Sequence, residues 1–81
     1  MPDKKSSEGK FSDKVDARTS PAEAAAMALR QEQKARAFYE ECARIMKHPG
    51  ARKMFEFLAQ EEKKHEALIQ KELDTFNFRE M

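Results

Sequence analysis

The sequence is poor in the residues on which many small domains depend. It has one cysteine among 81 residues, which excludes an internal disulfide and any zinc site built from cysteine thiolates. Its two glycines lie far apart, so no glycine-rich loop can hold the phosphates of a nucleotide. A chain this short usually needs a disulfide, a metal or a partner to be stable. Oligomerisation and a metal site without thiolates are the devices that are left.

Long apolar runs and an excess of one charge are missing as well. No run approaches the roughly 18 apolar residues of a membrane span, and the first residues lack the apolar segment of a secretion signal. Sixteen Lys and Arg against fifteen Asp and Glu leave a net charge of +1, which argues against nucleic-acid binding through bulk phosphate neutralisation. We therefore expect no membrane and no nucleic-acid partner. The lone thiol and the missing signal favour a cytoplasmic location.

Polar residues at the start of the sequence precede a clear helix start. Residues 1–20 are polar with mixed charges, so we expect a disordered or loosely ordered N-terminal arm. Ser20, Pro21 and Glu23 have the spacing of a capping box with proline at the first helical position. From there no glycine or proline occurs before Pro49. The arm should therefore lead directly into a long helix.

The pattern of helix formers and breakers predicts one helical domain over residues 21–81. We expect helices over about residues 21–47 and 51–76, with His48 beside the C-terminal end of the first one. A tight turn at His48-Pro49-Gly50 places the two helices antiparallel. The fold class is therefore all-α, a two-helix hairpin.

Three ionisable residues interrupt the apolar stripes of the two helices. Glu32 lies on the inner face of the first helix, and Glu62 and His65 lie on that of the second. A buried carboxylate without a partner is strongly destabilising. Three inward ionisable groups at one place therefore indicate that they bind a ligand. Glu32 precedes the turn by about as many residues as Glu62 and His65 follow it, which places all three about 20–25 Å from the turn at the usual rise per residue. The sequence thus predicts that they meet at one point.

A two-helix hairpin leaves half of its apolar face open. A two-fold dimer closes that face as a four-helix bundle and brings a second Glu32, Glu62 and His65 to the axis. Two divalent cations balance the charge of the four carboxylates. Oxygen ligands with imidazole and without thiolate suit iron or manganese, and zinc can take their place. We therefore expect a homo-oligomer, a dimer or a multiple of dimers, with a two-metal site.

These residues resemble a known family. The resemblance is to rubrerythrin, in the ferritin-like superfamily. It is carried by the stretch from Glu32 to Tyr39 (EQKARAFY) and by Phe55-x-x-Leu-Ala-x-x-Glu62-x-x-His65. The chain has the length of half a four-helix bundle, and in this it is similar to the encapsulated ferritins. The resemblance implies that Glu32 and Glu62 are carboxylate ligands, that Glu62 bridges two iron ions and that His65 is the nitrogen ligand. It also implies that Tyr39 hydrogen-bonds a ligand carboxylate. Plain packing of Tyr39 in the core is the alternative.

The resemblance implies a di-iron carboxylate protein that oxidises Fe(II) with O2 or H2O2 at a site shared between two subunits. It further suggests an encapsulin shell, and hence a nanocompartment, or an external electron donor as partners. The residues themselves leave two alternatives open: a helical dimerisation module without metal, and an iron or manganese carrier without turnover. Several other residues are expected to be structural, with a solvated face at Glu61, Lys63, Lys64 and Glu66, and core or interface packing at Phe38, Cys42, Phe55 and Phe57.

Overall fold

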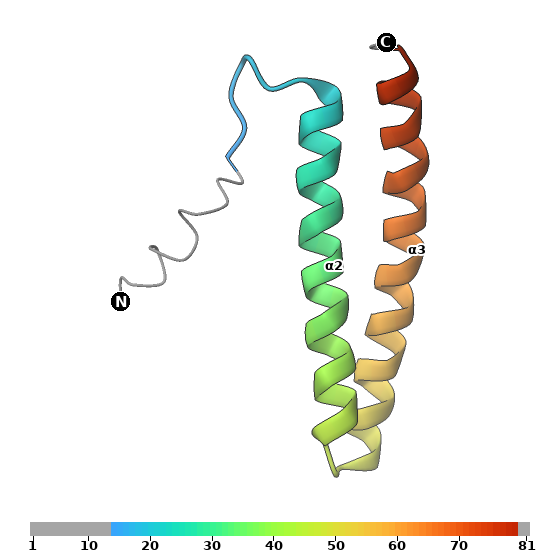
Figure 1. The fold of residues 1–81 in the computed structure, drawn as a ribbon. Coiled ribbons are helices and arrows are strands. Elements are labelled where there is room, and N and C mark those ends of the chain that lie inside the picture. The colour runs from blue at the N-terminus through green and yellow to red at the C-terminus, as the bar shows by residue number, and fades with distance from the viewer. Residues whose placement is uncertain (1–13, 80–81) are drawn as a thin grey trace, which may run out of the picture.

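The computed structural model describes residues 14–79 and consists of two helices side by side (Figure 1). Helix α2 spans Pro21–Ile45 and helix α3 spans Pro49–Arg79. They run antiparallel and are joined by a short loop at one end of the molecule, and the described part of the chain contains no strand. The predicted all-α hairpin is confirmed. Most of the arm predicted over residues 1–20 lies outside the described residues.

The start of α2 has the expected capping box. The hydroxyl of Ser20 accepts a hydrogen bond from the backbone N–H of Glu23 at 3.0 Å, and the Glu23 carboxylate accepts one from the Ser20 N–H at 2.9 Å. These bonds satisfy donors that every helix leaves free in its first turn. Just before them, the Asp16 carboxylate accepts from the Arg18 N–H at 2.8 Å and Thr19 N–H donates to the Asp16 carbonyl. The last residues of the arm therefore form a defined turn that the sequence did not predict.

The helix ends at the loop differ from the prediction. Helix α2 stops at Ile45 rather than near residue 47, and α3 begins at Pro49 rather than residue 51 and continues to Arg79. Proline suits the first turn of a helix because its missing N–H would have no partner there, so Pro49 opens α3 instead of forming the turn. His48 consequently lies at the N-terminus of α3. The prediction that it lies beside the C-terminal end of the first helix was wrong.

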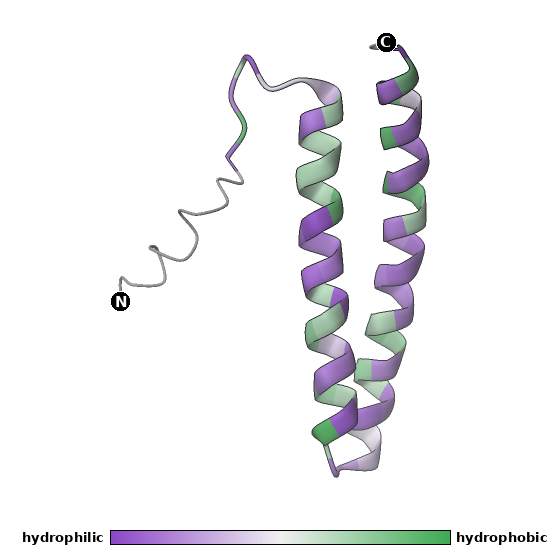
Figure 2. Ribbon diagram, viewed as in Figure 1, coloured by the Kyte–Doolittle hydropathy of each residue, from purple (hydrophilic) through white to green (hydrophobic). Residues whose placement is uncertain are grey.

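The hairpin buries almost no apolar side chain within one chain. Among residues 14–79 only Ala22 and Ala59 are buried. Figure 2 shows hydrophilic residues over much of both helices, with hydrophobic positions between them. Large apolar side chains that remain exposed include Phe38, Ile45, Met54, Phe57 and Leu68.

Exposed apolar side chains from both helices, among them Phe38, Phe57 and Leu68, lie on the same side of the hairpin. Glu32 and Glu62 face each other across the helix contact, and Phe38 and Leu68 each follow by six residues, the same rotation at about 100° per residue. In an antiparallel pair, equal rotations bring both side chains to one side of the plane of the helices. His65 is one turn from Leu68 and belongs to this side. We call it the open face.

Candidate metal centre

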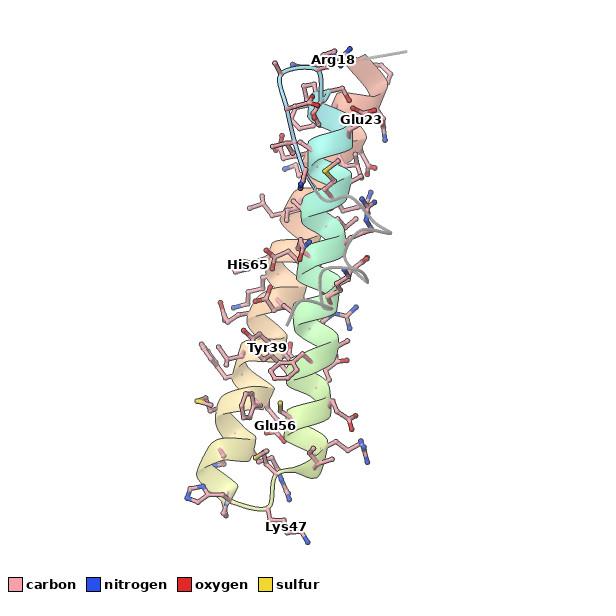
Figure 3. The ribbon with its side chains drawn as sticks, turned by 90° about the vertical axis from the view of Figure 1, so that its left-hand side faces the viewer. Arg18, Glu23, Tyr39, Lys47, Glu56 and His65 are labelled. Atoms are coloured by element: carbon pink, nitrogen blue, oxygen red, sulfur yellow. The ribbon has the colours of Figure 1, made fainter. Side chains whose placement is uncertain are left out.

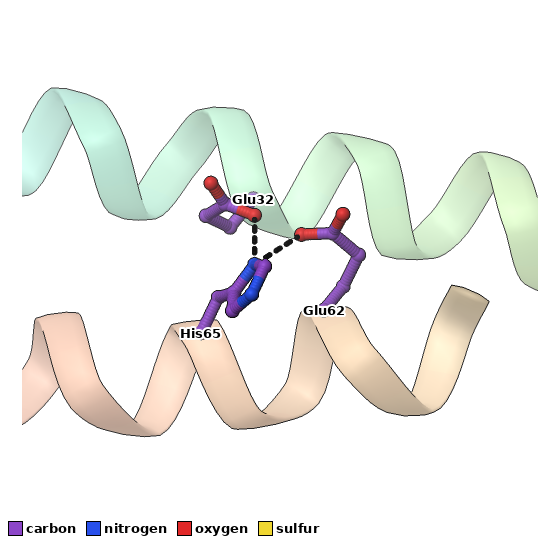
Figure 4. Close-up of side chains that lie close together, drawn as sticks. All are labelled: Glu32, Glu62 and His65. Carbon is purple, nitrogen blue, oxygen red and sulfur yellow. Dashed lines mark ion pairs between the residues drawn. The ribbon is translucent and has the colours of Figure 1, made fainter. Parts of the chain in front are cut away.

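Glu32, Glu62 and His65 converge at the middle of the hairpin. Glu32 comes from α2, and Glu62 and His65 come from one face of α3, three residues apart (Figure 4). The His65 Nδ1 atom lies 3.5 Å from a carboxylate oxygen of Glu32 and 3.5 Å from one of Glu62. One ligand atom from each residue lies within 4.8 Å of the other two. The prediction that these three side chains meet at one point is confirmed.

One oxygen of Glu62 is buried and has no hydrogen-bond partner among residues 14–79. The Glu62 side chain is 15% exposed, and its Oε1 atom accepts no hydrogen bond from the part of the chain that the structure describes. Its distance of 3.5 Å to His65 Nδ1 permits a charge interaction if the imidazole is protonated, but exceeds the usual length of an N–H···O bond. A carboxylate oxygen in this state is destabilising unless a cation or a donor satisfies it. A metal ion bound by the cluster would satisfy this oxygen of Glu62.

The donor set fits a hard or borderline divalent cation. Two carboxylates and one imidazole suit iron, manganese or zinc, whereas the described residues offer no thiolate at this point. The three ligand atoms are close enough for small side-chain rotations to bring them around one ion. His65 is 54% exposed and Glu32 is 29% exposed, so the cluster opens toward the open face and leaves coordination positions that one hairpin does not fill.

Tyr39 lies outside this cluster in the single chain. Figure 3 shows it between His65 and the loop, and it lies two turns along α2 from Glu32. Its ring stacks on Phe55 at a centroid distance of 6.2 Å and meets the edge of Phe38 at 5.8 Å. The Tyr39 hydroxyl forms no hydrogen bond within residues 14–79. A hydrogen bond from Tyr39 to a ligand carboxylate stays a prediction.

A second pair of charged residues, which the sequence interpretation missed, crosses the helices beside the cluster. Arg36 Nε donates to a Glu66 oxygen at 2.5 Å and Arg36 Nη2 donates to the other oxygen at 3.2 Å. Glu66 was expected on a solvated face, but its side chain is only 15% exposed, so that expectation was wrong. The hydrogen bonds that Arg36 donates, to Glu66 first and then to Glu40, raise the pKa of Arg36. The signal in the sequence was that Arg36 and Glu66 each follow a predicted ligand by four residues.

Comparison with known families identifies the chain. Residues 11–81 match the Rubrerythrin family. The chain belongs to the rubrerythrin family. No curated protein and no solved structure matches it. This family is one of di-iron carboxylate proteins, and Glu32, Glu62 and His65 are the described residues whose ligand atoms could hold a metal ion. No helix among the described residues is long and apolar enough to cross a membrane.

Proposed function

We propose that two copies of this rubrerythrin-family chain hold two iron ions between them and oxidise Fe(II) with O2 or H2O2. The observation that carries the proposal is the buried Glu62 Oε1 atom, which lies beside Glu32 and His65 and has no hydrogen-bond partner among the described residues. A protein without a metal at this point would keep a destabilising group that a leucine would remove.

The open face supports the second copy. A hairpin that buries only Ala22 and Ala59 within its described residues gains too little from apolar burial to offset the entropy of ordering its chain. Pairing two open faces would bury Phe38, Phe57 and Leu68, which are each about 60% exposed in the single chain. The same pairing would bring a second cluster toward the first, because His65 lies on the open face.

The residues of the shared site would divide the work between charge and geometry. Four glutamates from two chains would balance the charge of two divalent cations, and Glu62, the more buried carboxylate, would hold the metal together with Glu32. His65 would supply a nitrogen ligand, and the apolar side chains of the paired open faces would exclude water. Paired iron ions supply the electrons that reduce O2 or H2O2. The native metal, a cytoplasmic location, an encapsulin shell and an external electron donor stay predictions.

The test uses anaerobic Fe(II) titration followed by exposure to O2 or H2O2. We expect about one iron ion per chain, a near-UV absorbance that grows on oxidation, and a native mass that is a multiple of two chains. Glu62→Ala should abolish both binding and oxidation. Glu61→Ala is the matched control, because Glu61 is the neighbouring glutamate and pairs with the exposed Lys64.

Three other outcomes have distinct meanings. Parent-like iron oxidation by Glu62→Ala would refute the site. Iron binding without O2 or H2O2 consumption would indicate a metal carrier without turnover. A stable dimer whose stability does not respond to metal would indicate a dimerisation module, since a metal that binds the folded state must stabilise it.

A further inference from the structure

Arg36 reaches across the hairpin and is held by two glutamates. Besides its two bonds to Glu66, it donates from Nη1 to Glu40 at 3.1 Å. All three guanidinium nitrogens therefore donate to these carboxylates. The paired oxygens of Glu66 match the planar fork of the guanidinium, the geometry in which an arginine is held most firmly. Arg36 is thus fixed in position as well as in charge.

The pair lies at the level of the metal cluster. Arg36 follows Glu32 by four residues on α2, and Glu66 follows Glu62 by four on α3. Side chains of a helix lean toward its N-terminus, so Arg36 leans back toward Glu32 and Glu66 leans back toward Glu62. Because the helices are antiparallel, the two side chains meet between these levels. Figure 4 shows the Glu32 and Glu62 carboxylates near the same level.

A free guanidinium at this position would compete for the metal ligands. Glu62 Oε1 is buried without a hydrogen-bond partner among residues 14–79, and such an oxygen is a strong acceptor for any guanidinium that can reach it. Arg36 nevertheless donates to Glu66 and Glu40 and not to Glu62. Arg36 therefore neutralises Glu66 and Glu40, and the carboxylates of Glu32 and Glu62 remain available to a metal ion.

We propose that Glu66 is a positioning residue that holds Arg36 away from Glu32 and Glu62 and so keeps these carboxylates free for metal. The inference rests on the proposed function, because it concerns the same ligands. It predicts a specific failure when Glu66 is removed: Arg36 turns to Glu62 or Glu32 and takes the place of the cation. A residue that only clamped α2 to α3 would not produce this failure.

The experiment compares anaerobic Fe(II) affinity in four full-length proteins. They are the parent, Glu66→Ala, Glu61→Ala and the double variant Arg36→Gln with Glu66→Ala. We expect Glu66→Ala to weaken Fe(II) binding by about 10-fold to 100-fold, as is usual for residues that orient metal ligands. Glu61→Ala removes the same charge from an exposed ion pair and should change the affinity little. The double variant should recover most of the parent affinity, because no guanidinium remains to compete.

A crystal structure of metal-free Glu66→Ala provides a readout that does not depend on iron. We expect the Arg36 guanidinium within hydrogen-bond distance of Glu62 or Glu32. If the guanidinium points to solvent, or if Glu66→Ala binds Fe(II) as the parent does, the inference is wrong. A double variant as weak as Glu66→Ala would instead make the pair a clamp between the helices, which also overturns it.

Two further results separate this inference from the proposed function. If the parent binds no Fe(II), the metal site itself fails and the role of Glu66 fails with it. If the parent binds Fe(II) and only the Glu66 variants contradict expectation, the site stands and the positioning role does not. Should Glu66→Ala fold poorly by circular dichroism, Glu66→Gln keeps the side-chain volume while removing the charge, and the same affinities decide.

Discussion

His48 caps the helix that follows it, because its Nδ1 atom accepts a hydrogen bond from the backbone N–H of Ala51 at 3.1 Å. The His48 carbonyl also accepts from the Arg52 N–H at 2.9 Å, as the first bond of α3. The imidazole thus acts as the side-chain acceptor that serine or aspartate provides at most helix starts. Gly50 lies under the ring, since a Cβ there would come within 3.1 Å of the His48 imidazole.

Removing the His48 cap should destabilise the hairpin. His48→Ala leaves the Ala51 N–H without its acceptor, and loss of an N-cap side chain costs about 1 kcal/mol. His48→Asn offers a carbonyl oxygen at a comparable position and should stay close to the parent. Urea unfolding followed by circular dichroism measures the difference. Equal midpoints for all three proteins would show that the bond contributes nothing to the stability of α3.

Replacing Glu62 by an apolar side chain should stabilise the protein without metal while it abolishes the metal response. Glu62→Leu removes a buried oxygen that has no hydrogen-bond partner within residues 14–79, and such a group costs about 1–3 kcal/mol. Thermal unfolding with a chelator should therefore give a higher Tm for Glu62→Leu than for the parent. Adding Mn(II) or Fe(II) should raise the Tm of the parent only. Glu61→Leu is the control, and a Tm equal to the parent's with chelator is the expected result.

A lysine on the open face should prevent assembly. Phe57 is 61% exposed in the single chain, and burying such a side chain contributes about 1.5–3 kcal/mol per copy. Phe57→Lys should shift the native mass toward the single chain and weaken the helical signal at low micromolar concentration. Gln70→Lys is the control, because Gln70 lies about 200° around α3 from Leu68 at the usual 3.6 residues per turn. Unchanged native mass for Phe57→Lys would show that assembly uses another surface.

Acid should affect one exposed ion pair in a defined direction. A hydrogen bond from Arg44 lowers the pKa of Glu41 below its ordinary value of 4.5. Since the folded-state pKa is the lower one, this pair stabilises the fold above pH 4.5 and loses that contribution as pH falls through the folded pKa. Both side chains are more than half exposed, so the effect on stability is small. Carboxyl carbon NMR should show the pKa of Glu41 rising in Arg44→Ala.

The sequence predicted the parts of the structure that depend on local rules. The capping box at Ser20 and Glu23 follows from residue types at fixed spacing, and the meeting of Glu32 with Glu62 and His65 follows from helical rise and an antiparallel turn. The loop was harder, because Pro49 is compatible both with a turn and with the first turn of a helix. Only the path of the chain shows that α3 begins there.

The sequence alone could not predict that Arg36 pairs with Glu66. Both helices carry many charged residues, and the chain offers 16 Lys and Arg against 15 Asp and Glu. Which arginine meets which glutamate across two helices depends on side-chain lean and on small differences in rotation. Spacing from the predicted ligands points to Arg36 and Glu66 only after Glu32 and Glu62 have been placed.

The short loop between Ile45 and Pro49 makes the number of residues between Glu32 and Glu62 as important as their identity. Inserting or deleting one residue in the helical segments between Glu32 and Glu62 rotates everything beyond it by about 100°, which would carry His65 away from Glu32 while the helices remained intact. Substitutions in this segment change the strength of the site, whereas a change in its length separates the ligands. The site therefore tolerates substitutions between Glu32 and Glu62 far better than insertions or deletions there.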